Sequence, residues 1–106
     1  MNTETKKGAK IAKSGKKVQS PIRVGNNVLI RGVTLYYTGK IVGFSKEEIL
    51  LIDAAWIADT SRFSSALLTG ELSEVEPYPD GDVVAINRGA VSDTSDWKHP
   101  LPRSVK

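Results

Sequence analysis

From residue 21 onward, hydrophobic residues recur in short runs separated by glycine or polar turns. Val24, Val28 and Ile30 fall on one face at a period of two, which is typical of a strand. Residues 49–57 are nearly all apolar, with Asp53 as the only charge. Such a run predicts a central strand that is covered on both faces.

A second long run, residues 33–44, is rich in β-branched and aromatic residues and also predicts strand structure. Gly39 and Gly43 interrupt it, and glycines inside a strand indicate strong bending or a bulge. A polar turn at residues 45–48 separates this run from the next one. Further short strands are expected at three places: 72–75, 83–86 and 90–91.

One short helix is expected near residues 60–69. Asp59 or Thr60 is placed to cap its first turn, because a side-chain oxygen accepts hydrogen bonds from the free amides there. Gly70 is expected to end it. Three residues share the apolar face of this helix: Phe63, Ala66 and Leu67.

Several short strands with glycine-punctuated turns predict a mainly β fold, a small and strongly bent antiparallel barrel with one short helix. Residues 77–82 carry strong turn signals, and residues 87–89 form a tight connection between two strands. The C-terminal end is expected to be an irregular tail. Trp97 and Leu101 would hold this tail on the body, and core packing is the default expectation for Trp56 as well.

Charge divides the 106-residue chain into two parts. Residues 1–20 hold six lysines and one glutamate, a formal net charge of +5, whereas residues 21–106 hold nine Lys/Arg and eleven Asp/Glu, a net of −2. We therefore expect a basic N-terminal arm, 1–20, and one folded domain, 21–106. The chain has no cysteine, which excludes a disulfide framework and thiolate metal sites.

The arm has too few large apolar residues to offset its ordering entropy, so we expect it to be disordered or extended. One interpretation is a solvated tail, and the other is an arm that lies on nucleic acid or on an acidic protein surface. Without aromatic residues, its lysines provide affinity for polyanions but no base readout. The lysines in question are Lys6, Lys7, Lys10, Lys13, Lys16 and Lys17.

Two regions resemble the paired signatures of the Sm-like fold. Residues 39–44, a polar turn and residues 50–55 resemble the first signature, a bent strand ending in glycine followed by an apolar strand that closes on Asp-Ala. Residues 83–91 resemble the second, an apolar strand, Arg-Gly and a return strand. The resemblance implies a strongly bent five-stranded open barrel, edge-to-edge association into rings, and RNA binding in many members.

The chain departs from that family at its base-binding turn. Ser45 and Ile49 stand where the family usually carries Asp and Asn, although Arg88 is retained. SH3-like barrels share the bent-strand pattern and are the alternative fold. Arg31, Tyr37 and Arg88 are the candidate contacts for nucleic acid or a partner on the body, because an exposed tyrosine beside an arginine can stack on a base.

No catalytic or metal-ligating set is recognisable in the sequence. His99 is the only histidine, and it is flanked by Lys98 and Pro100 in the terminal segment. No glycine-rich phosphate loop follows a strand and opens a helix. The acidic residues between 71 and 82 lack the spacing of a calcium loop. We expect no enzyme activity, no metal and no cofactor.

Three functions follow as hypotheses. The first is a non-enzymatic assembly module that self-associates or docks on a larger structure, with the arm reaching a neighbour or nucleic acid. Its make-up also resembles accessory proteins of tailed phages. The second is an Sm-like RNA- or DNA-binding protein, and the third is a small viral inhibitor or ligand-sequestering protein. The sequence has no secretory signal and no membrane span, which predicts a cytoplasmic or virion location.

Overall fold

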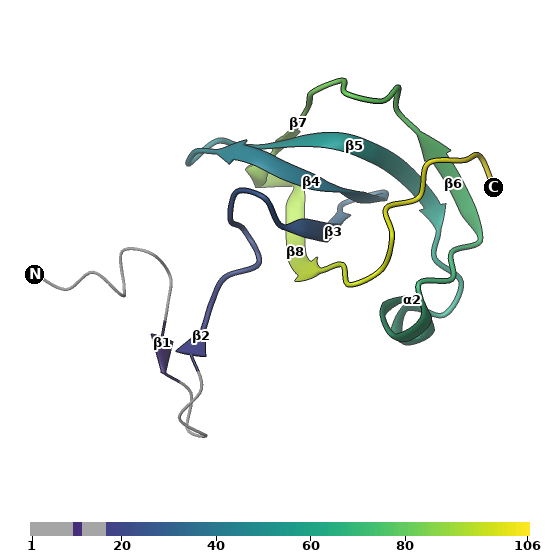
Figure 1. Cartoon of the computed structure of the whole chain (residues 1–106), viewed down its shortest axis with the longest axis horizontal. Coiled ribbons are helices and arrows are strands. Elements are labelled where there is room, and N and C mark those ends of the chain that lie inside the picture. The colour runs from purple at the N-terminus through teal and green to yellow at the C-terminus, as the bar shows by residue number, and fades with distance from the viewer. Residues whose placement is uncertain (1–9, 12–16) are drawn as a thin grey trace, which may run out of the picture.

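A computed structural model describes residues 10–11 and 17–106, and it shows a mainly β chain with one short α-helix (Figure 1). Two short strands, β1 (Lys10–Ile11) and β2 (Lys17–Val18), pair only with each other. The body contains β3 (Asn27–Gly32), β4 (Tyr36–Phe44), β5 (Glu48–Asp59), helix α2 (Phe63–Thr69), β6 (Glu74–Pro77), β7 (Val84–Asn87), the 3₁₀ helix η1 (Arg88–Ala90) and β8 (Val91–Asp96).

The main sheet is antiparallel, with the strand order β6-β5-β4-β3-β8. Strand β7 also pairs with β5, along Glu48–Leu51, while β6 pairs with the later part of β5, from Ala55 to Asp59. The long β5 therefore shares one edge between two partners and pairs with β4 along the other, which makes it a central strand, as its apolar sequence predicted. No ladder joins β7 or β6 to β8 among the described residues, so the sheet is open.

Both faces of the sheet bury side chains, because alternate residues of each strand point to opposite faces. The face that we call core 1 contains Val28, Ile30, Ile41, Ile49, Leu51, Ala54 and Ile86. The opposite face, core 2, lies beneath α2 and the C-terminal segment and contains Leu29, Ala55, Ile57, Ala66, Leu72, Val75 and Trp97.

The predicted bending of β4 is visible as two register shifts against β5, between Thr38 and Lys40 and between Ile41 and Gly43. A Cβ at Gly39 would lie 3.0 Å from the side chain of Leu51, so a larger residue would push the two strands apart. Glycine is needed here for close approach of the strands.

Helix α2 ends as expected, but it begins at Phe63, three residues later than the expected start. Gly70 ends it in a left-handed conformation, with φ of 81°. The N-cap is Arg62, which makes no side-chain capping bond, so the prediction of Asp59 or Thr60 as cap is wrong. Asp59 instead accepts from the amide of Ser61, whose φ is 62°, and this turn moves the helix start past both residues.

Three other expectations need correction. Strand β3 starts at Asn27, and Val24 is exposed, because the chain turns at Gly25 with φ of 91°. Residues 33–35 form the connection between β3 and β4. Strand β8 is longer than the two-residue return strand that the sequence indicated, since it pairs with β3 over most of its length.

The C-terminal segment follows core 2, as expected for a tail held by Trp97 and Leu101. Trp97 is buried and its ring stacks edge-on with His99 at 4.9 Å between centroids. The segment ends with a pair of backbone hydrogen bonds between Lys106 and Val75, each of 3.0 Å. This pairing covers the outer edge of β6.

Most of the predicted arm lies outside the described residues, including Lys6, Lys7, Lys13 and Lys16. The backbones of Lys10 and Lys17 belong to β1 and β2, where Lys10 pairs with Val18 and Ile11 with Lys17.

Candidate functional site

The predicted contact residues on the body are not brought together. Arg31 pairs across the sheet with Tyr36 on one side and Asp93 on the other, so its side chain lies on the face opposite Tyr37. Its guanidinium donates to Asp93 at 2.8 and 2.5 Å. That hydrogen bond and the charge of Asp93 raise the pKa of Arg31 above its ordinary value. Arg31 is thus already occupied by a carboxylate.

Arg88 opens η1 and is held by the preceding turn. Its Nη1 donates to the carbonyl of Ser45 at 2.7 Å, and its backbone amide donates to the carbonyl of Glu47 at 2.8 Å. A hollow of about 320 Å³ lies beside it, between Ser20–Ile22 and the start of β8. Ile49, which stands where the Sm-like turn carries Asn, is fully buried in core 1.

Tyr37 and Trp56 are direct cross-strand partners on the face of core 1. Tyr37 packs against that core, while Trp56, on the same face, is 41% exposed. The expectation that Trp56 is a core residue is therefore wrong, because the sheet is open at this end and the described residues leave much of this side chain uncovered. A groove of about 250 Å³, which we call the acidic aromatic groove, is lined by Trp56, Glu76, Pro77, Tyr78 and Pro79.

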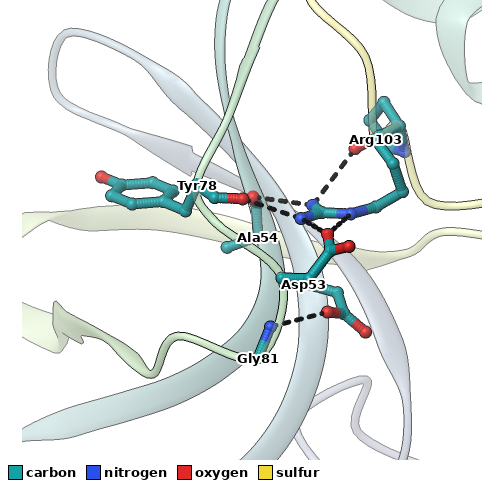
Figure 2. Close-up of polar contacts among 7 residues, drawn as sticks. Asp53, Ala54, Tyr78, Gly81 and Arg103 are labelled. Atoms are coloured by element: carbon teal, nitrogen blue, oxygen red, sulfur yellow. Dashed lines mark hydrogen bonds and ion pairs between the residues drawn. The ribbon is translucent and has the colours of Figure 1, made fainter.

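One side chain from the C-terminal segment holds the Tyr78 side of this groove in place (Figure 2). The guanidinium of Arg103 donates to the carbonyl of Tyr78 at 2.7 Å and to the carbonyl of Ala54 at 3.0 Å. It also donates to the carboxylate of Asp80 at 2.6 and 3.1 Å. The amide of Tyr78 in turn donates to the carbonyl of Ala54 at 2.8 Å. The five donors of a planar guanidinium suit such a convergent set of oxygens.

A second contact to the same turn comes from the bend in β5 (Figure 2). Asp53 adopts a left-handed backbone with φ of 51°, a conformation that Asp tolerates better than most residues. Its carboxylate accepts from the amide of Gly81 at 3.2 Å. The turn that carries Tyr78 is therefore fastened to β5 from two sides.

The rim of the acidic aromatic groove is negatively charged. Glu76 is the cross-strand partner of Trp56, and Glu74, two residues before it on β6, is the partner of Asp59. Val75 between the two glutamates points into core 2, so both glutamates lie on the side of Trp56. The groove thus presents an aromatic wall beside carboxylates that are exposed to solvent.

Comparison of the chain with protein-family models, curated proteins and solved structures found no match. Function is therefore inferred from the geometry of this chain alone. In the part of the chain that the structure describes, no helix is long and apolar enough to cross a membrane. The same residues contain no cluster of three or more histidine or acidic side chains placed to hold a metal ion.

Sequence reasoning named Tyr37, which does not line the groove, and missed the residues that do. The signal for Tyr78 was present, since two prolines and a glycine beside it mark an ordered turn. The signal for Trp56 was misleading, because it stands within an apolar run that elsewhere is buried. Arg103 has no local signal at all, since its partners are distant in sequence.

We expect Tyr78 to ionise at a higher pH than an ordinary tyrosine, whose pKa is about 10. Burial raises the pKa of Tyr78, and the nearby phenolate of Tyr37 raises it further. Stability contributed by the protonated phenol is thus complete below about pH 10 and is lost as the pH rises through the raised pKa. Absorbance of phenolate at alkaline pH measures this directly. The late-titrating step should disappear in Tyr78→Phe and remain in Tyr36→Phe.

Proposed function

We propose that this protein is a non-enzymatic assembly module that associates with further copies of itself through the edges of its sheet. The observation that carries the proposal is that β7 and β8, on either side of η1, each have only one strand partner in the described residues. Unpaired strand edges present N–H and C=O groups that can pair with another chain. This is the arrangement that the Sm-like resemblance implied for ring formation.

The register shows which groups are free. The amide of Arg88 donates to Glu47, and hydrogen-bonded pairs alternate in an antiparallel ladder, so Ile86 and Val84 are bonded to β5. The backbone groups of Ala85 and Asn87 therefore point away from β5. On β8, the bond from Trp97 to Asn27 places the outward groups at Thr94 and Asp96 by the same alternation.

The two edges differ in how they are protected. Strand β7 contains no charged residue and no proline, the devices that usually block pairing at an edge. Strand β8 contains Asp93 and Asp96, but Arg31 and Asn26 bind these carboxylates. We propose that β7 of one copy adds to β8 of the next, a head-to-tail contact that forms a ring where the rotation closes.

Light scattering tests this proposal when a single outward-pointing backbone amide, that of Ala85, is removed. The native chain should show the mass of an oligomer of the 11.5 kDa monomer, and Ala85→Pro should return it to the monomer mass. Proline removes only the outward amide of Ala85, so the ladder with β5 is retained. Ala85→Ser keeps the amide and serves as the control. A native chain that is monomeric at all concentrations would contradict edge association.

A further inference from the structure

The acidic aromatic groove contains no residue of β7 or β8, and strands β4 and β3 separate it from the free edge of β8. Its exposed wall is the indole of Trp56, which is the aromatic surface that attracts cations most strongly. Glu76 lines the same groove and is the direct cross-strand partner of Trp56, so its carboxylate supplies a negative charge beside that ring. The groove therefore suits the ammonium group of a lysine.

The groove is also prepared in advance. Arg103 fixes the carbonyl of Tyr78 at 2.7 Å, and Asp53 fixes the amide of Gly81 at 3.2 Å, so the turn behind the groove is held without a ligand (Figure 2). A binding surface that is already ordered loses less entropy when a partner binds. Pro77 and Pro79 stiffen the same turn further.

The chain itself carries the complementary group. Residues 1–20 have a net charge of +5 with lysines spaced by small residues, and the body that bears the groove has a net charge of −2. Every copy thus brings one cationic segment and one anionic groove. The body begins beside β8, where Ser20–Ile22 border a hollow with Val91 and Thr94, whereas the groove lies at β6, the other end of the strand order.

We propose that the lysine-rich segment 6–17 of one copy docks in the acidic aromatic groove of a second copy, with a lysine ammonium on the indole of Trp56 and paired with Glu76. The contact is separate from the pairing of β7 with β8 and joins neighbours through a different surface. Because most of its free energy is between opposite charges near the surface, it weakens as salt is added.

A complementation experiment tests directly whether the arm of one copy binds the groove of another. All chains carry Ala85→Pro, so the edge contact cannot contribute whether or not it exists. One chain has a neutral arm and an intact groove, and the other has an intact arm and Trp56→Ala. The neutral arm replaces each lysine with glutamine: Lys6, Lys7, Lys10, Lys13, Lys16 and Lys17.

Sedimentation equilibrium at low salt should show each chain alone as a monomer and their equimolar mixture as a heterodimer, while the chain with both features intact self-associates. Loss of the indole contact should weaken association roughly tenfold. Glu76→Lys, which alters only an exposed side chain, replaces Trp56→Ala if the latter fails to fold. Glu71→Gln, which removes an acidic charge outside the groove, should change the affinity less than twofold.

The proposal is overturned if the mixture stays monomeric, which would show that no arm enters the groove of another copy. It is also overturned if the Trp56→Ala chain associates as strongly as the intact one, because binding would then be a general attraction of the arm to acidic surface. Fluorescence of the buried Trp97 verifies that each variant is folded. Because every chain in this experiment carries Ala85→Pro, its outcomes can be interpreted even if the native chain shows no edge association.

Discussion

Replacing Arg103 with alanine is expected to destabilise the domain by about 2–3 kcal/mol, the range for losing charge-assisted hydrogen bonds that converge on partly buried groups. The side chain of Arg103 is 28% exposed, and its guanidinium donates to the carbonyls of Ala54 and Tyr78 as well as to Asp80. Alanine leaves these carbonyls with fewer donors and detaches the C-terminal segment from β5. Urea unfolding followed by Trp97 fluorescence should show a lower midpoint with an unchanged slope.

Arg31→Ala is the matched control, because Arg31 also forms a two-pronged bond to one carboxylate. Its side chain is 49% exposed and donates only to Asp93 among the described residues, so we expect a much smaller shift of the midpoint. Arg103→Lys should recover only part of the loss, since an ammonium cannot reach several oxygens in one plane. Equal shifts for Arg103→Ala and Arg31→Ala would show that the carbonyl contacts contribute nothing.

Tyr78 links this stability prediction to the groove. If Arg103 positions the turn, Arg103→Ala should weaken arm binding in the complementation experiment even where the protein is still folded. The carbonyl of Tyr78 is bonded directly to Arg103, whereas Trp56 is anchored independently in the ladders of β5. A positioning role therefore predicts a smaller loss of affinity for Arg103→Ala than the roughly tenfold weakening expected for Trp56→Ala.

Most of the strands, though not the full length of β8, were predictable because each carries its own local apolar signal. Core 1 and core 2 alternate along β3, where Leu29 faces opposite to Val28 and Ile30, and this alternation is written in the local sequence. The bends at Gly39 and Gly43 follow from the same local reading. Local chemistry thus predicts which residues form strands and where those strands bend.

The groove was not predictable in the same way. Trp56 and Ile57 are neighbours in one apolar run, yet Ile57 is buried in core 2 and Trp56 is exposed. The difference arises because α2 and the C-terminal segment cover one face of β5, while no described element covers the other face at this end. Which face a distant segment covers is a property of long-range packing, and no short window of sequence contains it.

The same distinction explains the cap of α2. Asp59 and Thr60 have the side chains of good caps and stand at suitable positions, so the local reading was chemically sound. Strand β5 extends to Asp59, however, because Glu74 of β6 pairs with it. Asp59 is thus part of the sheet, the hydroxyl of Thr60 donates to the carbonyl of Ser61, and the helix begins after this turn.

Gly70→Ala is expected to cost about 3 kcal/mol, of which the left-handed backbone contributes about 1 kcal/mol and a collision contributes the rest. At Gly70, φ is 81°, and a Cβ would lie 2.7 Å from Cγ of His99. His99 cannot withdraw freely, because its Nε2 is 2.8 Å from the carbonyl of Leu67 and its ring stacks on Trp97. The mutation would therefore disturb the helix end and core 2 together.

Gly81→Ala separates the two contributions, since Gly81 has the same φ of 81° and a Cβ there would meet no atom within 4 Å. Thermal unfolding should show a loss of about 1 kcal/mol for Gly81→Ala, which measures the backbone cost alone. His99→Ala combined with Gly70→Ala should cost less than the sum of the two single changes, because removing the ring relieves the collision. If Gly70→Ala costs no more than Gly81→Ala, the imidazole moves aside without penalty, and the C-terminal segment is less firmly held on α2 than its contacts indicate.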